Sequence, residues 1–208
     1  MKLPRVFVGL VGALAITAVS ACSDAEGGSA VPNGPTTPTG QAPSAPGSTP
    51  SGGSDAPTVP NPVDVSALES DPCSALSSAQ VERLNLQSGK KDSVGTGPLC
   101  EYEYDDDSAS RVSIIQTPDF TNGLTDVYAR KDSLAYFEPT EISGYPAVYA
   151  SRSDGRANGI CQLHVGLTDS FVATLYVQLT HSTPDYPRGC EVAELTAQTM
   201  IENLKGGS

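Results

Sequence analysis

The densest group of side chains suited to metal binding is an acidic run in the middle of the chain. Glu101, Glu103 and the three residues Asp105–Asp107 lie close together. Calcium is bound in proteins by oxygen ligands of this kind, so calcium binding is one interpretation of the run. Other residues alternate with the two glutamates, however, which predicts a strand with both glutamates on one face. The aspartates then fall in a turn, and no EF-hand spacing follows. We therefore favour a solvated turn over a metal site.

A short match to a catalytic motif occurs in a polar, glycine-containing loop. Ser88 and Lys91 have the Ser-x-x-Lys spacing of penicillin-interacting enzymes. That chemistry needs the serine at the start of a helix and a partner motif such as Lys-Thr-Gly, which the sequence lacks. We interpret the match as a coincidence.

The two histidines show no catalytic or metal-binding pattern. His164 interrupts the apolar alternation of a predicted strand and is expected to point away from its apolar face, and His181 follows the end of the next strand. Neither has a nucleophile or a metal ligand at an informative spacing, and the common hydrolase, metalloprotease and phosphate-loop motifs are absent. The sequence thus predicts no catalytic residue, no metal and no cofactor. A site assembled from distant acidic residues and His164 stays open.

The N-terminal residues have the order of a secretory signal. Two basic residues among the first five precede an uncharged, mostly apolar stretch over residues 6–19, and two small residues follow. The stretch is shorter than the roughly 20 apolar residues that cross a bilayer. Residues 19–22, Val-Ser-Ala-Cys, resemble the lipobox of bacterial lipoproteins. The resemblance implies that Cys22 is acylated and holds the protein in the lipid bilayer, at the outer face of the cytoplasmic membrane. The alternative is a secreted protein with Cys22 as a spare thiol.

The chain is expected to have three parts. Residues 1–21 are the signal peptide, residues 22–62 are the lipidated cysteine with a disordered linker, and residues 63–208 are one globular domain. The linker is rich in Pro, Gly, Ser and Thr and has no aromatic residue. Such a segment cannot bury enough surface to offset the entropy of ordering it. Its composition would also suit O-glycosylation.

Four further cysteines lie in the predicted domain. They are Cys73, Cys100, Cys161 and Cys190. An even number of cysteines in an exported chain implies disulfides, for which three pairings exist. Separations of 27 and 29 residues favour the sequential pairing, Cys73–Cys100 and Cys161–Cys190. Zinc ligation is the alternative, but it lacks a close Cys-x-x-Cys pair, and an oxidising compartment disfavours it.

Helical signals occur near both ends of the domain. Asp71 is a suitable cap for a helical turn with Pro72 at its first position. Residues 77–80, Ser-Ser-Ala-Gln, have capping-box spacing and predict a short helix. Apolar residues three and four positions apart over residues 190–204 predict an amphipathic helix that lies across a sheet. Residues 128–137 are also expected to be helical.

Strand signals fill most of the space between these helices. Apolar alternation or continuous apolar runs predict strands over residues 100–104, 112–114, 142–150, 160–167 and 171–179. Short polar connections between successive strands indicate antiparallel pairing. The predicted fold class is therefore α+β, with an antiparallel sheet packed by a C-terminal helix and a short N-terminal helix and held by two disulfides.

Three tyrosines are candidate ligand contacts. Gly144–Ala147 interrupts a strand-like run, and proline within a strand marks an edge or a bulge. We favour a bend that only the fold requires, and the alternative is the rim of a binding groove at which Tyr145 and Tyr149 are exposed. Tyr176 is the third candidate because it lies on the opposite face of its strand from the apolar residues.

Several short motifs together resemble a known family. They are Asp-Pro-Cys-Ser-Ala-Leu at 71–76, Cys-Glu-Tyr at 100–102, Gly-Tyr-Pro-Ala at 144–147, Cys161 on a strand, and Cys-Glu-Val-Ala at 190–193. In this order, over residues 68–205, they resemble an actinobacterial lipoprotein family known as domain of unknown function 3558. Tyr102 departs from the family pattern, in which a tryptophan is often expected. The resemblance implies a fold and a location in the cell envelope, but no activity.

Charge narrows the classes of partner and of function. Residues 63–208 carry 21 acidic and 10 basic residues, a net charge of −11. Such a surface repels nucleic acid, which we do not expect as a partner. The anchor, the tether and the lack of a catalytic pattern predict a non-catalytic binding or accessory module that holds an envelope protein or a small ligand. The alternatives are a cell-wall-acting hydrolase or transferase, and an envelope protein without a ligand.

Overall fold

The computed structural model describes residues 55–95, 97–106 and 109–206. The predicted signal peptide, the predicted lipidation site Cys22 and the predicted linker up to residue 54 lie outside the described residues. The elements, with 3-10 helices written η, are α1 (Ser66–Ser70), η1 (Pro72–Ala75), α2 (Ser78–Arg83), β1 (Lys90–Val94), β2 (Gly97–Glu103), β3 (Arg111–Gln116), α3 (Leu124–Tyr128), η2 (Lys131–Ser133), β4 (Tyr136–Ile142), β5 (Tyr145–Ser151), η3 (Arg156–Asn158), β6 (Ile160–Thr168), β7 (Phe171–Gln178) and α4 (Gly189–Leu204).

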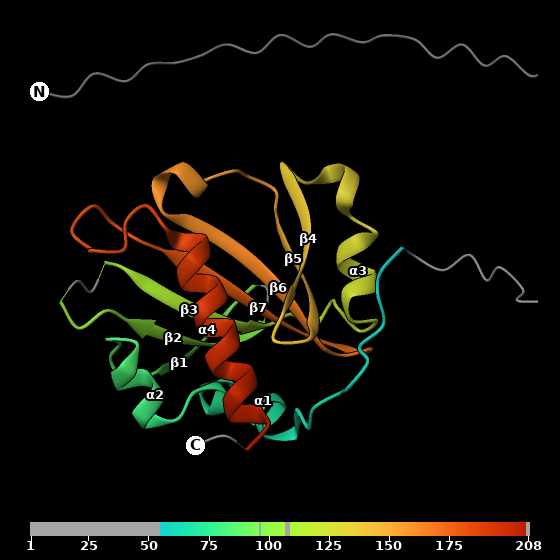
Figure 1. Ribbon diagram of the computed structural model, residues 1–208, viewed down its shortest axis with the longest axis horizontal. Coiled ribbons are helices and arrows are strands. Elements are labelled where there is room, and N and C mark those ends of the chain that lie inside the picture. The colour runs from blue at the N-terminus through green and yellow to red at the C-terminus, as the bar shows by residue number, and fades with distance from the viewer. Residues whose placement is uncertain (1–54, 96, 107–108, 207–208) are drawn as a thin grey trace, which may run out of the picture. The chain divides into compact units, whose positions relative to one another are not determined.

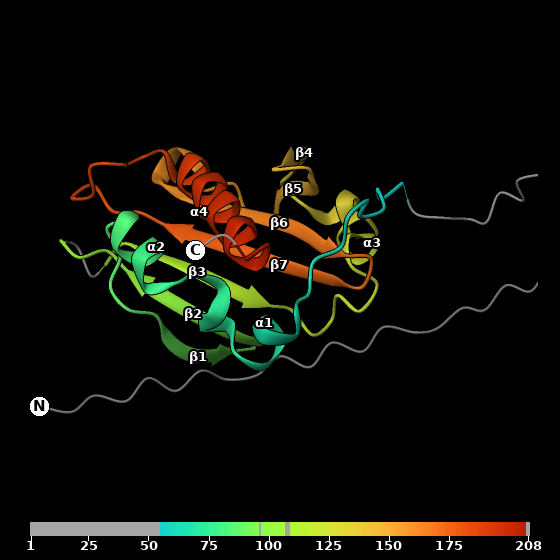
Figure 2. The ribbon, with the colours of Figure 1, turned by 60° about the horizontal axis from the view of Figure 1, so that its bottom comes forward.

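Seven strands form one antiparallel sheet in the order β1-β2-β3-β7-β6-β5-β4 (Figure 1). Strands that follow one another in the sequence pair in most places, and β3 pairs with β7 over a long separation, with Ile114 opposite Leu175. Helix α4 crosses the sheet, and α1 and α2 lie on the same side as α4 (Figure 2). The predicted α+β class, with its antiparallel sheet and C-terminal helix, is confirmed.

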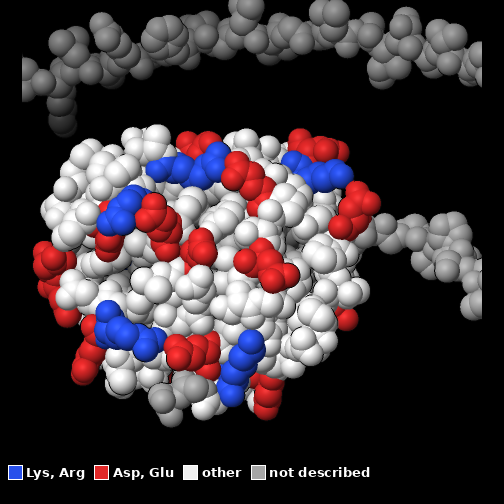
Figure 3. All heavy atoms as spheres, viewed as in Figure 1, with Lys and Arg blue, Asp and Glu red and all other residues white. Residues whose placement is uncertain are grey.

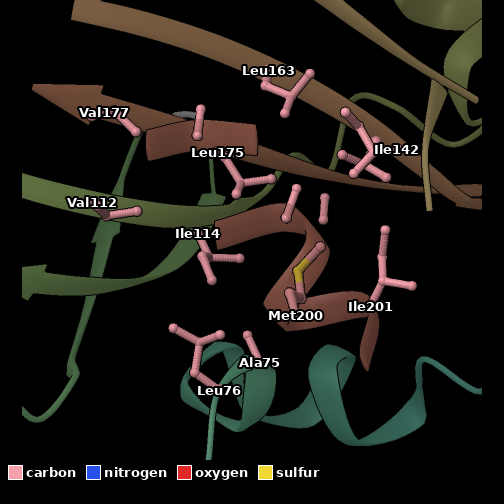
Figure 4. Close-up of a cluster of buried hydrophobic side chains, with 14 of the residues drawn as sticks. Ala75, Leu76, Val112, Ile114, Ile142, Leu163, Leu175, Val177, Met200 and Ile201 are labelled. Atoms are coloured by element: carbon pink, nitrogen blue, oxygen red, sulfur yellow. The ribbon is translucent and has the colours of Figure 1, made fainter. Parts of the chain in front are cut away.

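The face of the sheet that α4 covers, which we call the first face, is almost entirely apolar. Strand β6 contributes four fully buried residues to it, namely Cys161, Leu163, Val165 and Leu167. Helix α4 contributes Ala193, Ala197, Met200 and Ile201, which recur at spacings of three and four and are also buried. Figure 4 shows Met200 among side chains of the sheet and of η1. This packing forms the main hydrophobic core of the domain.

Two disulfides attach helical elements to this face. Cys73 of η1 is bonded to Cys100 of β2, and Cys190 of α4 is bonded to Cys161 of β6. The pairing is therefore the sequential one. The bonds hold the beginning and the end of the domain against the same sheet.

The predicted helix caps are present. Asp71 Oδ1 accepts a hydrogen bond of 2.9 Å from the backbone N–H of Cys73 at the start of η1, where Pro72 is the first residue. Ser77 and Gln80 form a capping box at the start of α2, in which Gln80 Oε1 accepts from the Ser77 N–H at 2.8 Å. These caps satisfy backbone donors that would otherwise have no partner.

The opposite side of the sheet, the second face, is only partly covered. Helix α3 packs against it in a smaller apolar cluster that includes Leu124, Val127, Val148 and Val172. The remainder of this face carries polar side chains, among them Gln162, which alternates along β6 with the apolar residues of the first face.

The prediction of one helix over residues 128–137 is wrong, since the segment holds only the last residue of α3 and the short 3-10 helix η2 before the next strand. Helix α3 ends at Tyr128, and β4 begins at Tyr136 and pairs with β5 as far as Ile142 opposite Tyr145. The run 142–150, predicted as one strand, is mainly the second strand of this hairpin. The backbone hydrogen bonds of the hairpin and the burial of Tyr136 on the sheet outweigh the weak helical preference of a short segment.

The chain contacts the sheet before residue 63, within the predicted linker. Val59 is buried, and its backbone N–H donates a 2.8 Å hydrogen bond to Asp169 Oδ1 in the turn between β6 and β7. Within the described ranges, no helix has the length and apolar character needed to span a membrane.

Candidate functional site

A cavity of about 460 Å³ opens on the second face of the sheet, beside α3. This volume lies within the range of about 300–1,000 Å³ that small-molecule sites occupy. Strands β3, β5, β6 and β7 form the floor of the cavity, and α3 with the segments next to it forms a wall. We call it the α3 cavity.

The register of the sheet brings the polar residues of the floor together. Thr174 of β7 lies opposite Ile115 of β3 on one side and His164 of β6 on the other. Tyr176 lies opposite Gln162 in the next row. Residues two positions apart in a strand share a face, so both rows point into the α3 cavity.

His164, in the floor of the α3 cavity, has a strongly lowered pKa. It is buried, its Nδ1 lies 2.9 Å from Thr174 Oγ1, and its ring packs edge-on against Phe120 with 5.7 Å between centroids. Burial lowers the pKa of the imidazole to about 4, since the charged form would lose its hydration, and the nearby charge of Arg130 acts in the same direction. A hydrogen bond with the backbone of Ala150 acts against this shift. His164 is therefore neutral at pH 7.

Two arginines line the same cavity. Arg130, two residues after α3, holds its guanidinium carbon 4.9 Å from the centroid of the Phe120 ring, a cation–π contact. Arg152 follows the end of β5 and is exposed. Asp119 is the single acidic residue among the described residues that line the cavity.

The three candidate tyrosines do not converge on one site. Tyr176 lines the α3 cavity. Tyr149 lies on the first face, beside an open groove of about 780 Å³ along α4, and its hydroxyl donates a 3.2 Å hydrogen bond to Glu194 Oε2. Burial raises the pKa of Tyr149 to about 12, and the charge of Glu194 adds to the effect.

The alternative in which Tyr145 is exposed at the rim of a groove is wrong. The residue is 2% exposed and packs in the main core. Ser143 and Gly144 form a tight turn with φ of 52° and 86°, after which Tyr145 is the first residue of β5 and points to the first face. Lys205 Nζ lies 4.7 Å from the centroid of its ring and covers it further.

Glu101 and Glu103 lie on the same face of the sheet as His164 but several strands away, on β2. Glu103 pairs with Lys90 at 2.8 Å and Glu101 with Arg111 at 3.8 Å. Because β3 and β7 lie between β2 and β6, Glu101 is separated from the His164 strand by three strand spacings, about 14 Å. In the described part of the chain, no three His, Cys, Asp or Glu residues are grouped so as to hold a metal ion. Asp107 lies outside the described residues.

The Ser-x-x-Lys match lies in a loop and an edge strand. Ser88 is exposed in the loop before β1, and Lys91 in that exposed strand pairs with Asp71 at 2.7 Å. Ser88 is therefore not at the start of a helix, which this chemistry requires.

The chemistry available in the α3 cavity favours binding over proton transfer. A neutral histidine bonded to a hydroxyl is the geometry of a base and a nucleophile. However, an imidazole with a pKa of about 4 is a weak base at neutral pH, and Arg130 disfavours the imidazolium that would form. His164 and Thr174 instead form a hydrogen bond with each other in the uncharged floor of the cavity.

Sequence reasoning missed the residues that complete the cavity. Arg130, Arg152, Thr174 and Phe120 belong to different segments, and no local pattern marks any of them. Strand alternation indicates that Thr174 and Tyr176 share a face, but the pairing of Thr174 with His164 depends on the register of β6 and β7.

These features define the class of protein as an α+β domain on a seven-stranded antiparallel sheet, with two disulfides and a ligand-sized cavity. Residues 17–203 match the model of a family described as protein of unknown function, DUF3558, and the chain belongs to this family. No curated protein matches the chain, and no solved structure does.

Proposed function

We propose that this protein is a non-catalytic, lipid-anchored binding or accessory module of the actinobacterial cell envelope. Cys22 would carry the acyl chains at the outer face of the cytoplasmic membrane, and the linker would hold the domain away from the bilayer. The sequence of residues 19–22 and the signal-like segment before it support the anchor. Two or more acyl chains suffice for stable attachment, at about 0.8 kcal/mol per buried methylene.

The observation that carries the proposal of binding is the α3 cavity. It combines apolar walls with a few converging polar groups, the usual composition of a small-molecule site. Its buried polar floor is already satisfied, because His164 and Thr174 are within hydrogen-bond distance of each other. A ligand can therefore enter without leaving these groups unpaired.

Native mass spectrometry of the full-length protein, gently extracted from its own membrane, tests this function. We expect an acylated chain that carries a reproducible non-covalent mass, which would be a small ligand or an envelope protein. The Cys22→Ala variant should leave the membrane fraction or accumulate as a precursor. Normal membrane retention of this variant would contradict the anchor, and a bare acylated monomer would contradict stable binding.

A hydrolase or transferase acting on cell-wall material is the second candidate, and the contact between His164 and Thr174 is the observation in its favour. The two functions differ in their response to His164→Gln, which keeps a neutral polar side chain. A binding module should still hold its ligand, with an affinity changed by less than about tenfold because only the cavity floor is altered, whereas an enzyme that uses His164 as a base should lose activity on cell-wall fragments.

A further inference from the structure

Most basic residues of this acidic domain form ion pairs, and two of the few that do not line the α3 cavity. Seven of the ten basic residues after residue 62 lie within 4 Å of a carboxylate, namely Arg83, Lys90, Lys91, Arg111, Lys131, Arg156 and Arg188. Figure 3 shows this pairing on the face that carries α4, where most blue side chains lie beside red ones. Among the described residues, three cations have no such partner: Arg130, Arg152 and Lys205.

Two of these three cations line the same cavity. Arg130 comes from the end of α3 and Arg152 from the end of β5, so two unrelated segments bring positive charge to one opening. Lys205 lies on the other side of the sheet, against the ring of Tyr145. In a domain with about twice as many acidic as basic residues, Arg130 and Arg152 outnumber Asp119, the single acidic residue among the described residues of the lining, and leave a net positive charge in the cavity available to a ligand.

The rest of the cavity restricts the kind of anion. Ile115, Phe120, Val127 and Leu134 give it an apolar wall, and the His164 floor is neutral. A fully hydrated inorganic ion would gain nothing from this wall. An arginine guanidinium binds the two oxygens of a carboxylate or a phosphate through parallel hydrogen bonds, while an apolar body fills the space behind.

We propose that the α3 cavity binds a small organic anion, with its oxyanion group at Arg130 and Arg152 and its apolar body against Phe120 and the α3 wall. This assignment rests on the proposed binding function and names its ligand class. Phenylbutyrate is a probe of this shape, phenylbutyramide is its neutral counterpart and phenylbutylamine its cationic one. Phenylpropyl phosphate separates a phosphate ligand from a carboxylate ligand.

Isothermal titration of the full-length protein with the four probes tests the assignment. We expect phenylbutyrate or phenylpropyl phosphate to bind about tenfold or more tightly than the amide, and the amine to bind least, because only the anions pair with the arginines. The stronger of the two anions identifies the oxyanion group. The Arg130→Gln/Arg152→Gln variant should lose this preference and bind anion and amide alike.

Lys205→Gln is the control for net charge and is compared with the single variant Arg152→Gln, since each removes one positive charge that lacks a carboxylate partner and only Lys205 lies outside the cavity. It should leave both affinities within about twofold. An equal loss of anion binding in Lys205→Gln would overturn the assignment, because the effect would then be a general one of net charge.

The outcomes separate the ligand class from the proposed function. Equal binding of amide and anion, or tighter binding of the amine, would overturn the anion class while leaving a binding module in place. Failure of all four probes, together with an added mass in native mass spectrometry, would also overturn the anion site but not the binding function. Failure of the probes and a bare monomer would overturn both.

Discussion

The two faces of the sheet differ in what their side chains contact, and β6 shows the difference within one strand. Leu163 and Val165 point to the first face and are fully buried under α4. Gln162 and His164 point to the second face and line the α3 cavity. The first face, closed by a helix and two disulfides, stabilises the domain. The second face can therefore contain the α3 cavity with its polar side chains, which the close packing of an apolar core would exclude.

Because of this difference, the stability of the fold depends on pH through His164. A buried imidazole that cannot take up a proton makes the fold sensitive to acid, whereas the apolar side chains of the first face do not titrate.

Removal of the disulfide between β6 and α4 should have the largest effect. The Cys161→Ala/Cys190→Ala variant opens a link across 29 residues, which is expected to lower the free energy of unfolding by about 3.5 kcal/mol on the chain-entropy model. Urea denaturation without reductant measures this loss. Ligand affinity per folded molecule should be unchanged, because the bond lies on the first face. A loss below about 1 kcal/mol would show that packing alone holds α4.

Shortening one side chain on each face of β6 tests the comparison directly. Leu163→Ala removes a fully buried side chain and should cost about 3 kcal/mol of unfolding free energy. Gln162→Ala, one residue earlier on the second face, should cost less than about 0.5 kcal/mol, because its side chain is half-buried beside the cavity. Chemical denaturation of the two variants under the same conditions measures both losses of unfolding free energy. Similar losses would contradict the assignment of stability to the first face.

Acid should destabilise the protein through His164. At pH 7 the imidazole is neutral in both the folded and the unfolded chain. Below its ordinary pKa of 6.5 the unfolded chain takes up a proton that the folded protein does not accept until about pH 4. Stability is therefore lost as the pH falls from 6.5 to 4, by about 2 kcal/mol between pH 7 and pH 5.

The variant His164→Gln is the control for this prediction. It removes the titrating group while the other ionisable residues stay the same, so the difference between the two pH profiles isolates His164. Denaturation midpoints measured across this range should diverge between the two proteins as the pH falls. Parallel profiles would show that the ring is protonated in the folded state.

Loss of the Tyr149 hydroxyl should have the smallest effect among the changes on the first face. Tyr149→Phe removes the 3.2 Å hydrogen bond to Glu194 at the edge of the first face, which is worth about 1 kcal/mol or less. Thermal unfolding measures the change, and Tyr176→Phe provides the comparison on the second face. Only Tyr176→Phe should alter the affinity for the anionic probes, since only Tyr176 lines the α3 cavity. An effect of Tyr149→Phe on that affinity would mean that the groove along α4 takes part in binding.

Local patterns predicted most of the first face. Alternation along β6 and β7 indicates which residues are buried, and the spacing in residues 190–204 indicates how α4 packs. The prediction for residues 128–137 was wrong because the structure there depends on pairing with a separate segment and not on a local pattern. Tyr136 joins β4 through its pairing with Ser151, a contact that no property of the segment itself encodes.

The candidate site was predictable only in part. Alternation placed His164 on the side away from the apolar residues, which is where it lies. Its burial, its contact with Thr174 and the proximity of Arg130 to Phe120 result from the packing of α3 and the loops around it on the sheet. Tyr145 shows the same limit, since its exposure depends on the residues that cover it and not on its own neighbours in the sequence.

The sequence by itself determined five of the seven strands, the capped elements η1 and α2 and the α+β class, because these follow from the period of apolar residues and from hydrogen bonds between near neighbours. Only the tertiary structure decided which polar side chains meet in the α3 cavity and which arginines lack a carboxylate partner. Such contacts join residues from separate segments, and their geometry is set by strand register and by helix packing rather than by local preference.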